Sequence, residues 1–257
     1  MRSNFWERRG GVAVRRDNVD RGRPPVHRRR PFENIVVDAG LAGLQPEIGG
    51  RHVAVVGSAP LPKALRIPDA HYVIVVNGAV SSVPFRVPNL WVVNSRIKPM
   101  EHWSRERRFL HTEMMRQAAK RHVETVAFLT RQEQAEHYTA TWLREQGTTY
   151  DRGIVISRHD RERLEVQSGA RTIAMKKDAT SAGIFAGILA LWAHAATVTF
   201  YGISFGLGYH YLPGRKMPLN ARAHVQGDRL ALRELRQKYP GRVFGTIVEP
   251  TREQRAS

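Results

Sequence analysis

The clearest pattern in the sequence is a series of short apolar runs, each followed at once by small or polar residues. The first three runs are residues 52–56, 72–76 and 90–93. None of them alternates between apolar and polar positions, as a strand with one face in solvent would. Each run therefore predicts a strand that is buried on both faces, which is typical of a parallel sheet.

Further along the chain, helical and strand patterns alternate. We expect helices at residues 113–121, 132–146, 181–194 and 230–238, and strands at residues 123–129, 153–157, 198–201 and 243–248. The apolar helix at 181–194 has Asp178 and Thr180 as candidate N-caps, and its Ala and Gly positions allow close packing on a sheet. The alternation predicts an α/β fold with a Rossmann-like, mainly parallel sheet flanked by helices, and with ligands at the carboxyl ends of the strands.

Length and composition fit a single domain of this kind. A chain of 257 residues, of which 42% are hydrophobic, has room for little more than one domain. We expect residues 1–30 to be a basic, disordered tail and residues 31–257 to form the Rossmann-like domain. The absence of Cys excludes a disulfide framework, a thiolate nucleophile and a sulfur-based zinc site. No apolar run reaches the roughly 18 to 20 residues of a membrane span, and no secretory signal is present, so we expect a cytoplasmic protein.

The net charge of +18 would by itself favour binding to nucleic acid, because a basic surface releases counterions when it meets a phosphate backbone. Its distribution weakens that interpretation. Residues 1–30 contain ten Arg against three acidic residues, so +7 of the charge lies in the tail. Such a segment could rest on an anionic membrane surface or on nucleic acid, or it could be a solvated arm with no partner.

Small and amide residues follow four of the predicted strands. They are Gly57, Ser58, Ala59, Asn77, Gly78, Asn94, Ser95 and Gly202. Because the carboxyl ends of parallel strands meet at one edge of a sheet, we expect these residues to converge on one crevice. Glycine lets a backbone approach a phosphate, and an Asn side chain can bond a ribose or a base edge, although both are also common turn residues. The chain lacks GxGxxG and GK[ST] loops, which argues against a nicotinamide cofactor and a P-loop nucleotide.

The start of the apolar helix is a candidate anion site. Thr180, Ser181 and Gly183 lie where unpaired backbone amides and the helix dipole favour negative charge. A phosphate there would also meet two hydroxyl groups. The alternative is ordinary helix capping.

The segment after Gly202 supplies the candidate acid–base residues. His210 and His224 could act as general bases near neutral pH, and Asp228 follows His224 by one helical turn, where it could orient the imidazole if a helix begins there. Tyr211, Arg215 and Lys216 lie between the two histidines, and a cation there would pair with a carboxylate or phosphate of a substrate. Structural roles for the two histidines are the alternative. No closely spaced His and carboxylate set follows a strand, so we predict no required metal and no cofactor.

Four parts of the sequence resemble motifs of the sialyltransferase family, the glycosyltransferases that use a CMP-activated acidic sugar. VAVVGSAPL at residues 53–61, with Asp69 and YVIVVNGA at residues 72–79, is similar to the long sialylmotif. TSAGI at residues 180–184 through VTFYGI at residues 198–203 is similar to the short motif. His210 with Tyr211 resembles the third motif, and His224 with Asp228 the final one. The resemblance covers about residues 51–240.

The chain departs from the family pattern at several positions. Ser58 replaces the usual Asn of the first turn, Val75 and Val76 stand where an Arg is usual, and Asp228 lies one residue closer to its His than the usual Glu. The disulfide that joins the two large motifs in animal members cannot form without Cys. These differences indicate a distant, bacterial-type relative.

The resemblance implies a GT-A-like variant of the Rossmann-like fold and an inverting, metal-independent glycosyltransferase. It would move sialic acid, Kdo or a similar acidic sugar from a CMP donor to a hydroxyl of a glycan or glycolipid. His224 would be the base, with His210 and the helix start stabilising the leaving phosphate, and Arg215 or Lys216 would neutralise the sugar carboxylate. The tail could hold the enzyme at the inner membrane face.

The rival hypotheses are a non-catalytic nucleotide-binding protein and a basic nucleic-acid-associated protein; we expect no specific nucleic acid partner.

Overall fold

A computed structural model describes most of the predicted domain. It covers residues 40–59, 67–83, 87–94, 119–130, 135–170, 180–203 and 224–245, together with Arg105, Arg108, Phe109, Thr112, Glu113 and Arg116. The proposed tail lies outside these residues, and its boundary stays a prediction.

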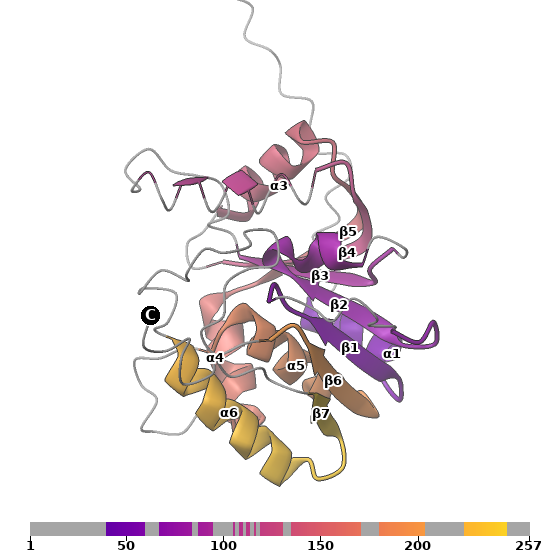
Figure 1. Cartoon of the computed structure of the whole chain (residues 1–257), viewed down its shortest axis with the longest axis vertical. Coiled ribbons are helices and arrows are strands. Elements are labelled where there is room, and N and C mark those ends of the chain that lie inside the picture. The colour runs from indigo at the N-terminus through magenta and orange to yellow at the C-terminus, as the bar shows by residue number, and fades with distance from the viewer. Residues whose placement is uncertain are drawn as a thin grey trace, which may run out of the picture. The chain divides into compact units, whose positions relative to one another are not determined.

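Seven strands form one sheet in the order β5-β4-β3-β2-β1-β6-β7 (Figure 1). The strands are β1 (His52–Val56), β2 (Tyr72–Val76), β3 (Leu90–Asn94), β4 (His122–Leu129), β5 (Thr149–Ile156), β6 (Thr197–Tyr201) and β7 (Val243–Gly245). Every neighbouring pair is parallel. The prediction of a mainly parallel α/β sheet is therefore confirmed, and every strand in the described part is parallel to its neighbours.

Helices cover both faces of the sheet. The helical segments are η1 (Leu41–Leu44), α1 (Gln45–Ile48), η2 (Asn77–Ser82), α3 (Ala135–Glu145), α4 (Arg158–Gln167), α5 (Ala182–Trp192) and α6 (Val225–Lys238). One core cluster joins α1, α4, α5 and α6 to one face, and a second joins η2 and α3 to the other (Figure 1). In β1, Val53 and Val55 belong to the first cluster, and Ala54 and Val56 to the second. Burial on both faces explains why the central strands carry no polar alternation.

Helix α5 packs directly on the sheet, and its glycines allow this. A Cβ atom added at Gly187 would lie 2.2 Å from Cζ of Phe200 in β6. The expected close packing is thus confirmed. The N-cap prediction was wrong: the cap is Ser181, not Thr180, because the Ser181 hydroxyl accepts the hydrogen bond of the Ile184 amide. The other candidate, Asp178, lies outside the described residues.

The sequence pattern located most elements but not all. β1 and β2 have the predicted bounds, and β3, β4, β6 and α3 agree within a few residues. β5 and α6 begin earlier than predicted, at Thr149 and Val225. Of the predicted helix at residues 113–121, Glu113 and Arg116 are helical. Residues 119–121 are not helical, so that prediction extended too far, and the other four residues lie outside those that the structure describes.

Helix α4 was missed altogether. A capping box starts it, in which Ser157 and Asp160 bond each other's backbone amides. Within the described ranges, no helix is long and apolar enough to cross a membrane.

Candidate functional site

The ends of β3, β2, β1 and β6 lie side by side, so the four strand ends singled out in the sequence share one edge of the sheet. The strands that follow β1 in sequence add on one side of it, through β2 to β5, and β6 and β7 add on the other. The boundary between β1 and β6 is therefore the topological switch point, where open α/β sheets bind their ligands.

The β1 and β6 ends are bonded to each other. The Gly57 amide donates to the Tyr201 carbonyl at 2.8 Å, and the Ala59 amide donates to the Gly202 carbonyl at 2.8 Å. A Cβ atom at Gly57 would lie 2.5 Å from the Gly202 oxygen. Gly202 itself has a φ of 61°, in the left-handed region that favours glycine. Close packing between the two turns thus requires Gly57, whatever ligand the edge binds.

Asn77 links the β2 and β3 ends. Its Oδ1 accepts the Asn94 amide at 3.2 Å, and its carbonyl accepts the Trp91 indole N–H at 2.8 Å. Its φ of 49° lies in the left-handed region, which Asn tolerates better than most residues. The Ser58 hydroxyl donates to the Val76 carbonyl at 3.4 Å, which joins the β1 and β2 ends. The sequence-predicted residues on these strands therefore form a continuous edge.

The start of α5 lies against the β6 end of this edge. A Cβ atom at Gly183 would lie 2.6 Å from Cδ1 of Ile203, and the same methyl group would be 2.4 Å from a Cβ at Gly57. Gly57 and Gly183 therefore both pack against the same methyl group of Ile203. The first-turn amides of α5 lie at the same edge as the strand ends, as an anion site there would need.

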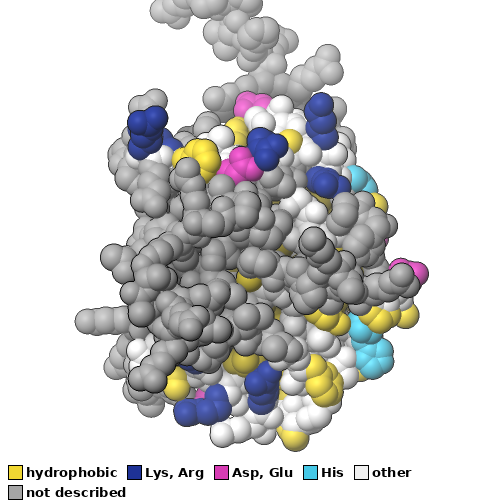
Figure 2. All heavy atoms as spheres, in the orientation of Figure 1, with side chains coloured by type: hydrophobic (Ala, Val, Ile, Leu, Met, Phe, Trp, Pro, Cys, Tyr) yellow, Lys and Arg dark blue, Asp and Glu magenta, His cyan; other side chains and the backbone are white. Residues whose placement is uncertain are grey.

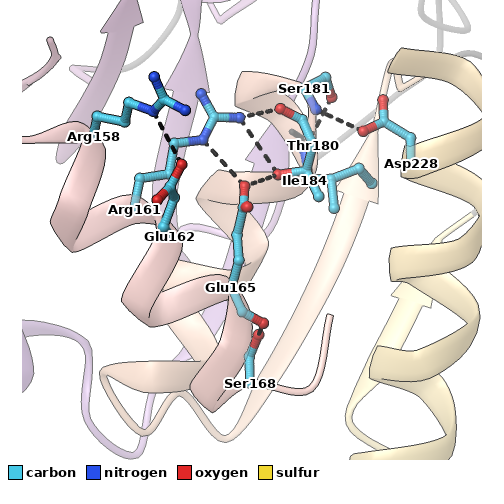
Figure 3. A network of polar contacts seen from close by, with 9 residues as sticks. All are labelled: Arg158, Arg161, Glu162, Glu165, Ser168, Thr180, Ser181, Ile184 and Asp228. Atoms are coloured by element: carbon cyan, nitrogen blue, oxygen red, sulfur yellow. Dashed lines mark hydrogen bonds and ion pairs between the residues drawn. The ribbon is translucent and has the colours of Figure 1, made fainter. Parts of the chain in front are cut away.

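Asp228, in the first turn of α6, is bonded to the start of α5. Its Oδ1 accepts the Ser181 amide at 2.6 Å, and the residue is only 5% exposed (Figure 3). Burial raises the pKa of Asp228 to about 6, although the hydrogen bonds from Ser181 and the nearby His224 and Arg161 oppose the rise. Asp228 thus joins two helix starts.

On the other side of α5, a buried ion pair from α4 holds Thr180. Arg161 pairs with Glu165 at 3.1 Å, and Glu165 Oε1 accepts the Thr180 hydroxyl at 2.6 Å. Arg161 also donates to the Thr180 carbonyl (Figure 3). Glu165 and Thr180 are each 1% exposed. Thr180 was predicted to bind substrate. In the structure its hydroxyl donates its proton to Glu165 instead.

His224 is the residue just before α6, which begins at Val225 and not at the predicted residue 230. The condition on which Asp228 could orient the imidazole, a helix that begins at His224, is therefore met. It lies one turn before Asp228, and its charge lowers the pKa of that carboxyl group. The role of Asp228 in orienting the imidazole stays a prediction. His210, Tyr211, Arg215 and Lys216 lie outside the described residues.

Sequence reasoning missed Arg161 and Glu165. Two features pointed to a helix at this position: the Ser157 and Asp160 capping box, and the i,i+4 spacing of Arg and Glu. The contact with Thr180 depends on tertiary packing and leaves no local pattern. No group of three or more metal-ligating side chains occurs in the part of the chain that the structure describes.

Comparisons with known proteins find a likeness in fold only. No family model and no curated protein matches the chain. The sialyltransferase CstII from Campylobacter jejuni in complex with cytidine-5'-monophosphate is 14% identical with a TM-score of 0.49, over 77% of this chain and 81% of that one. The monofunctional alpha-2,3-sialyltransferase Cst-I from the same organism is 12% identical with a TM-score of 0.48, over 76% and 75%. These similarities are remote.

Proposed function

We propose that this chain is a glycosyltransferase that moves an acidic sugar, of the sialic acid or Kdo type, from a CMP donor to a hydroxyl of a glycan or glycolipid. The observation that carries the proposal is the hydrogen bond from the Ser181 amide to Asp228, 47 residues later. It joins the segments that resemble the short and the final sialylmotifs. The contacts of Gly57 and Ala59 with the β6 end join the long motif to the same edge. The segments that resemble the long, short and final motifs therefore meet at one switch point, which supports a single shared site.

In the proposed reaction, His224 removes the proton of the acceptor hydroxyl. The hydroxyl oxygen then attacks the anomeric carbon, the bond from that carbon to the phosphate oxygen breaks, and its electron pair leaves with CMP. A single displacement inverts the anomeric centre. The amides at the start of α5 and His210 stabilise the leaving phosphate, so the scheme requires no metal.

The remaining site residues would hold the donor. Residues of the edge formed by β3, β2, β1 and β6 would line the nucleotide: Gly57, Ser58, Ala59, Asn77, Asn94 and Gly202. Ser181 and Gly183 would meet the phosphate, and Tyr211, Arg215 and Lys216 the sugar. A GT-A-like fold and a position at the inner membrane face, through the basic tail, belong to the same proposal.

A thermal-shift comparison of nucleotides tests the donor class. CMP present at about 100 times its Kd should stabilise the folded chain by about 2.7 kcal/mol, because a ligand bound only by the folded state raises its stability. UDP, GDP, ADP and NAD at the same concentration should have little effect. A preference for UDP or NAD would overturn the proposal.

The nucleic acid hypothesis makes a different prediction. On the face seen in Figure 2, the described Lys and Arg side chains lie in separate groups and form no continuous patch. Tight, steeply salt-dependent binding to nucleic acid that survives deletion of residues 1–30 would favour this rival.

A further inference from the structure

Two buried carboxylates from different helices hold consecutive residues at the start of α5. Glu165 of α4 accepts the Thr180 hydroxyl at 2.6 Å, and Asp228 of α6 accepts the Ser181 amide at 2.6 Å (Figure 3). The two carboxylates bind the chain from opposite sides (Figure 3). Both are almost fully buried, at 1% and 5% exposure.

We propose that Arg161, Glu165 and Asp228 form a clamp that sets the direction of the first turn of α5 and so aims its amides at the donor phosphate. The inference rests on the proposed function. The three are positioning residues, because they act through Thr180 and Ser181.

The arrangement of hydrogen bonds at the helix start supports this role. Ser181 Oγ accepts the Ile184 amide at 3.3 Å, and the Ser181 carbonyl accepts the Phe185 amide at 2.9 Å. The Ser181 amide is taken by Asp228. The backbone donors of this turn that remain for a ligand are the amides of Ala182 and Gly183, and the Ser181 hydroxyl keeps its own proton to donate. Their direction follows from the residues just before them, which are those that the clamp holds.

The Arg161–Glu165 pair is better suited to positioning than to stability. Removing two charges from water opposes the gain from their attraction, so a buried pair often contributes little net stability. Its geometry, however, is specific. Arg161 bonds the Thr180 carbonyl as well as Glu165, and its guanidinium lies 5.1 Å from the Phe185 ring centre in α5. Contacts with the backbone just before α5 and with a ring in α5 fix the orientation of the helix start.

The test is a paired substitution with a matched control on the same helix. Arg161→Met with Glu165→Met removes the clamp on the α4 side but keeps the volume of the side chains. Arg158→Met with Glu162→Met is the control, since that i,i+4 pair is also bonded, at 3.0 Å, but has exposed side chains. The affinities of each variant for CMP and for cytidine are measured by calorimetry, and their ratio reports the contribution of the phosphate.

We expect the clamp variant to lose about five- to tenfold of the preference for CMP over cytidine, the size of one hydrogen bond, with its affinity for cytidine unchanged. The control should keep the wild-type ratio. Equal weakening of both ligands, or an unchanged ratio, would overturn the clamp and leave the proposed function intact. A wild-type chain with no preference for CMP over cytidine would instead contradict the proposed phosphate site, and the clamp with it.

A milder variant keeps the test decisive if the double variant does not fold. Glu165→Gln retains an oxygen that can accept the Thr180 hydroxyl but has no charge to hold Arg161. A smaller loss of the CMP preference, about threefold, is expected, because hydrogen bonds to a charged group are roughly twice as strong as neutral ones. A full wild-type ratio in this variant also counts against the clamp.

Discussion

The backbone amide of Ser181 donates to the buried carboxylate of Asp228 at 2.6 Å, which ties the start of α5 to the first turn of α6. The starts of both helices carry partial positive charge, so a carboxylate between them is favourably placed. The same burial that shields this bond opposes ionisation of Asp228. Because burial raises the pKa of Asp228, the stability of the fold depends on pH.

The first prediction concerns Asp228→Asn. Because the pKa of Asp228 rises from 3.8 to about 6 on folding, the folded chain keeps a proton that the unfolded chain has already released between these values. The free energy of unfolding should therefore fall as pH rises through this window, by up to about 3 kcal/mol. Asn cannot ionise but can still accept the Ser181 amide.

Urea unfolding of both proteins at several pH values from about 4 to 7.5 measures the difference. The stability of Asp228→Asn relative to wild type should increase up to about pH 6 and then level off. Parallel pH profiles for the two proteins would show that Asp228 is not the group responsible.

The second prediction separates the two glycines that contact Ile203. Gly57→Ala should destabilise the chain by about 1 to 3 kcal/mol, because its Cβ meets the rigid Gly202 carbonyl as well as the Ile203 methyl group. Gly183→Ala meets the methyl group at 2.6 Å and no backbone atom that close. Ile203→Val, which removes this methyl group, should therefore rescue Gly183→Ala but not Gly57→Ala. Thermal unfolding of the single and double variants measures the effect, and rescue of both glycine variants would contradict the backbone clash.

The third prediction concerns the buried ion pair. Arg161→Ala should destabilise the chain by about 3 to 5 kcal/mol, since it leaves the Glu165 carboxylate buried without its cation. Arg161→Met with Glu165→Met should lie within about 1 kcal/mol of wild type, because no unpaired charge remains. Denaturant midpoints measure both. If the double variant were as unstable as the single one, the pair would be a net source of stability and its role in positioning would lose support.

How far the sequence predicts this protein differs between the fold and the site. Apolar runs such as Tyr72–Val76 predict buried parallel strands because both faces of the sheet are covered, a property that each run carries locally. The prediction that the ends of β1, β2, β3 and β6 share one edge needed only the parallel topology of the sheet. The partner of Thr180 could not be predicted in this way, because Glu165 reaches it only through the packing of α4 on α5. The charged, weakly apolar sequence of α4 also concealed the helix itself.

The last prediction tests the base. His224→Ala should lower sugar transfer by about 10²- to 10⁴-fold, the usual contribution of a general base, and should leave stabilisation by CMP unchanged. The exposed His159 of α4 offers a matched control, and His159→Ala should transfer sugar at the wild-type rate. The measurement is transfer from CMP-sialic acid and CMP-Kdo to a glycan acceptor, with the CMP thermal shift recorded beside it. Undiminished transfer by His224→Ala would remove His224 from the mechanism. A wild-type chain that binds CMP but transfers neither sugar would instead favour a non-catalytic nucleotide-binding protein, because the site at the sheet edge would remain without the chemistry.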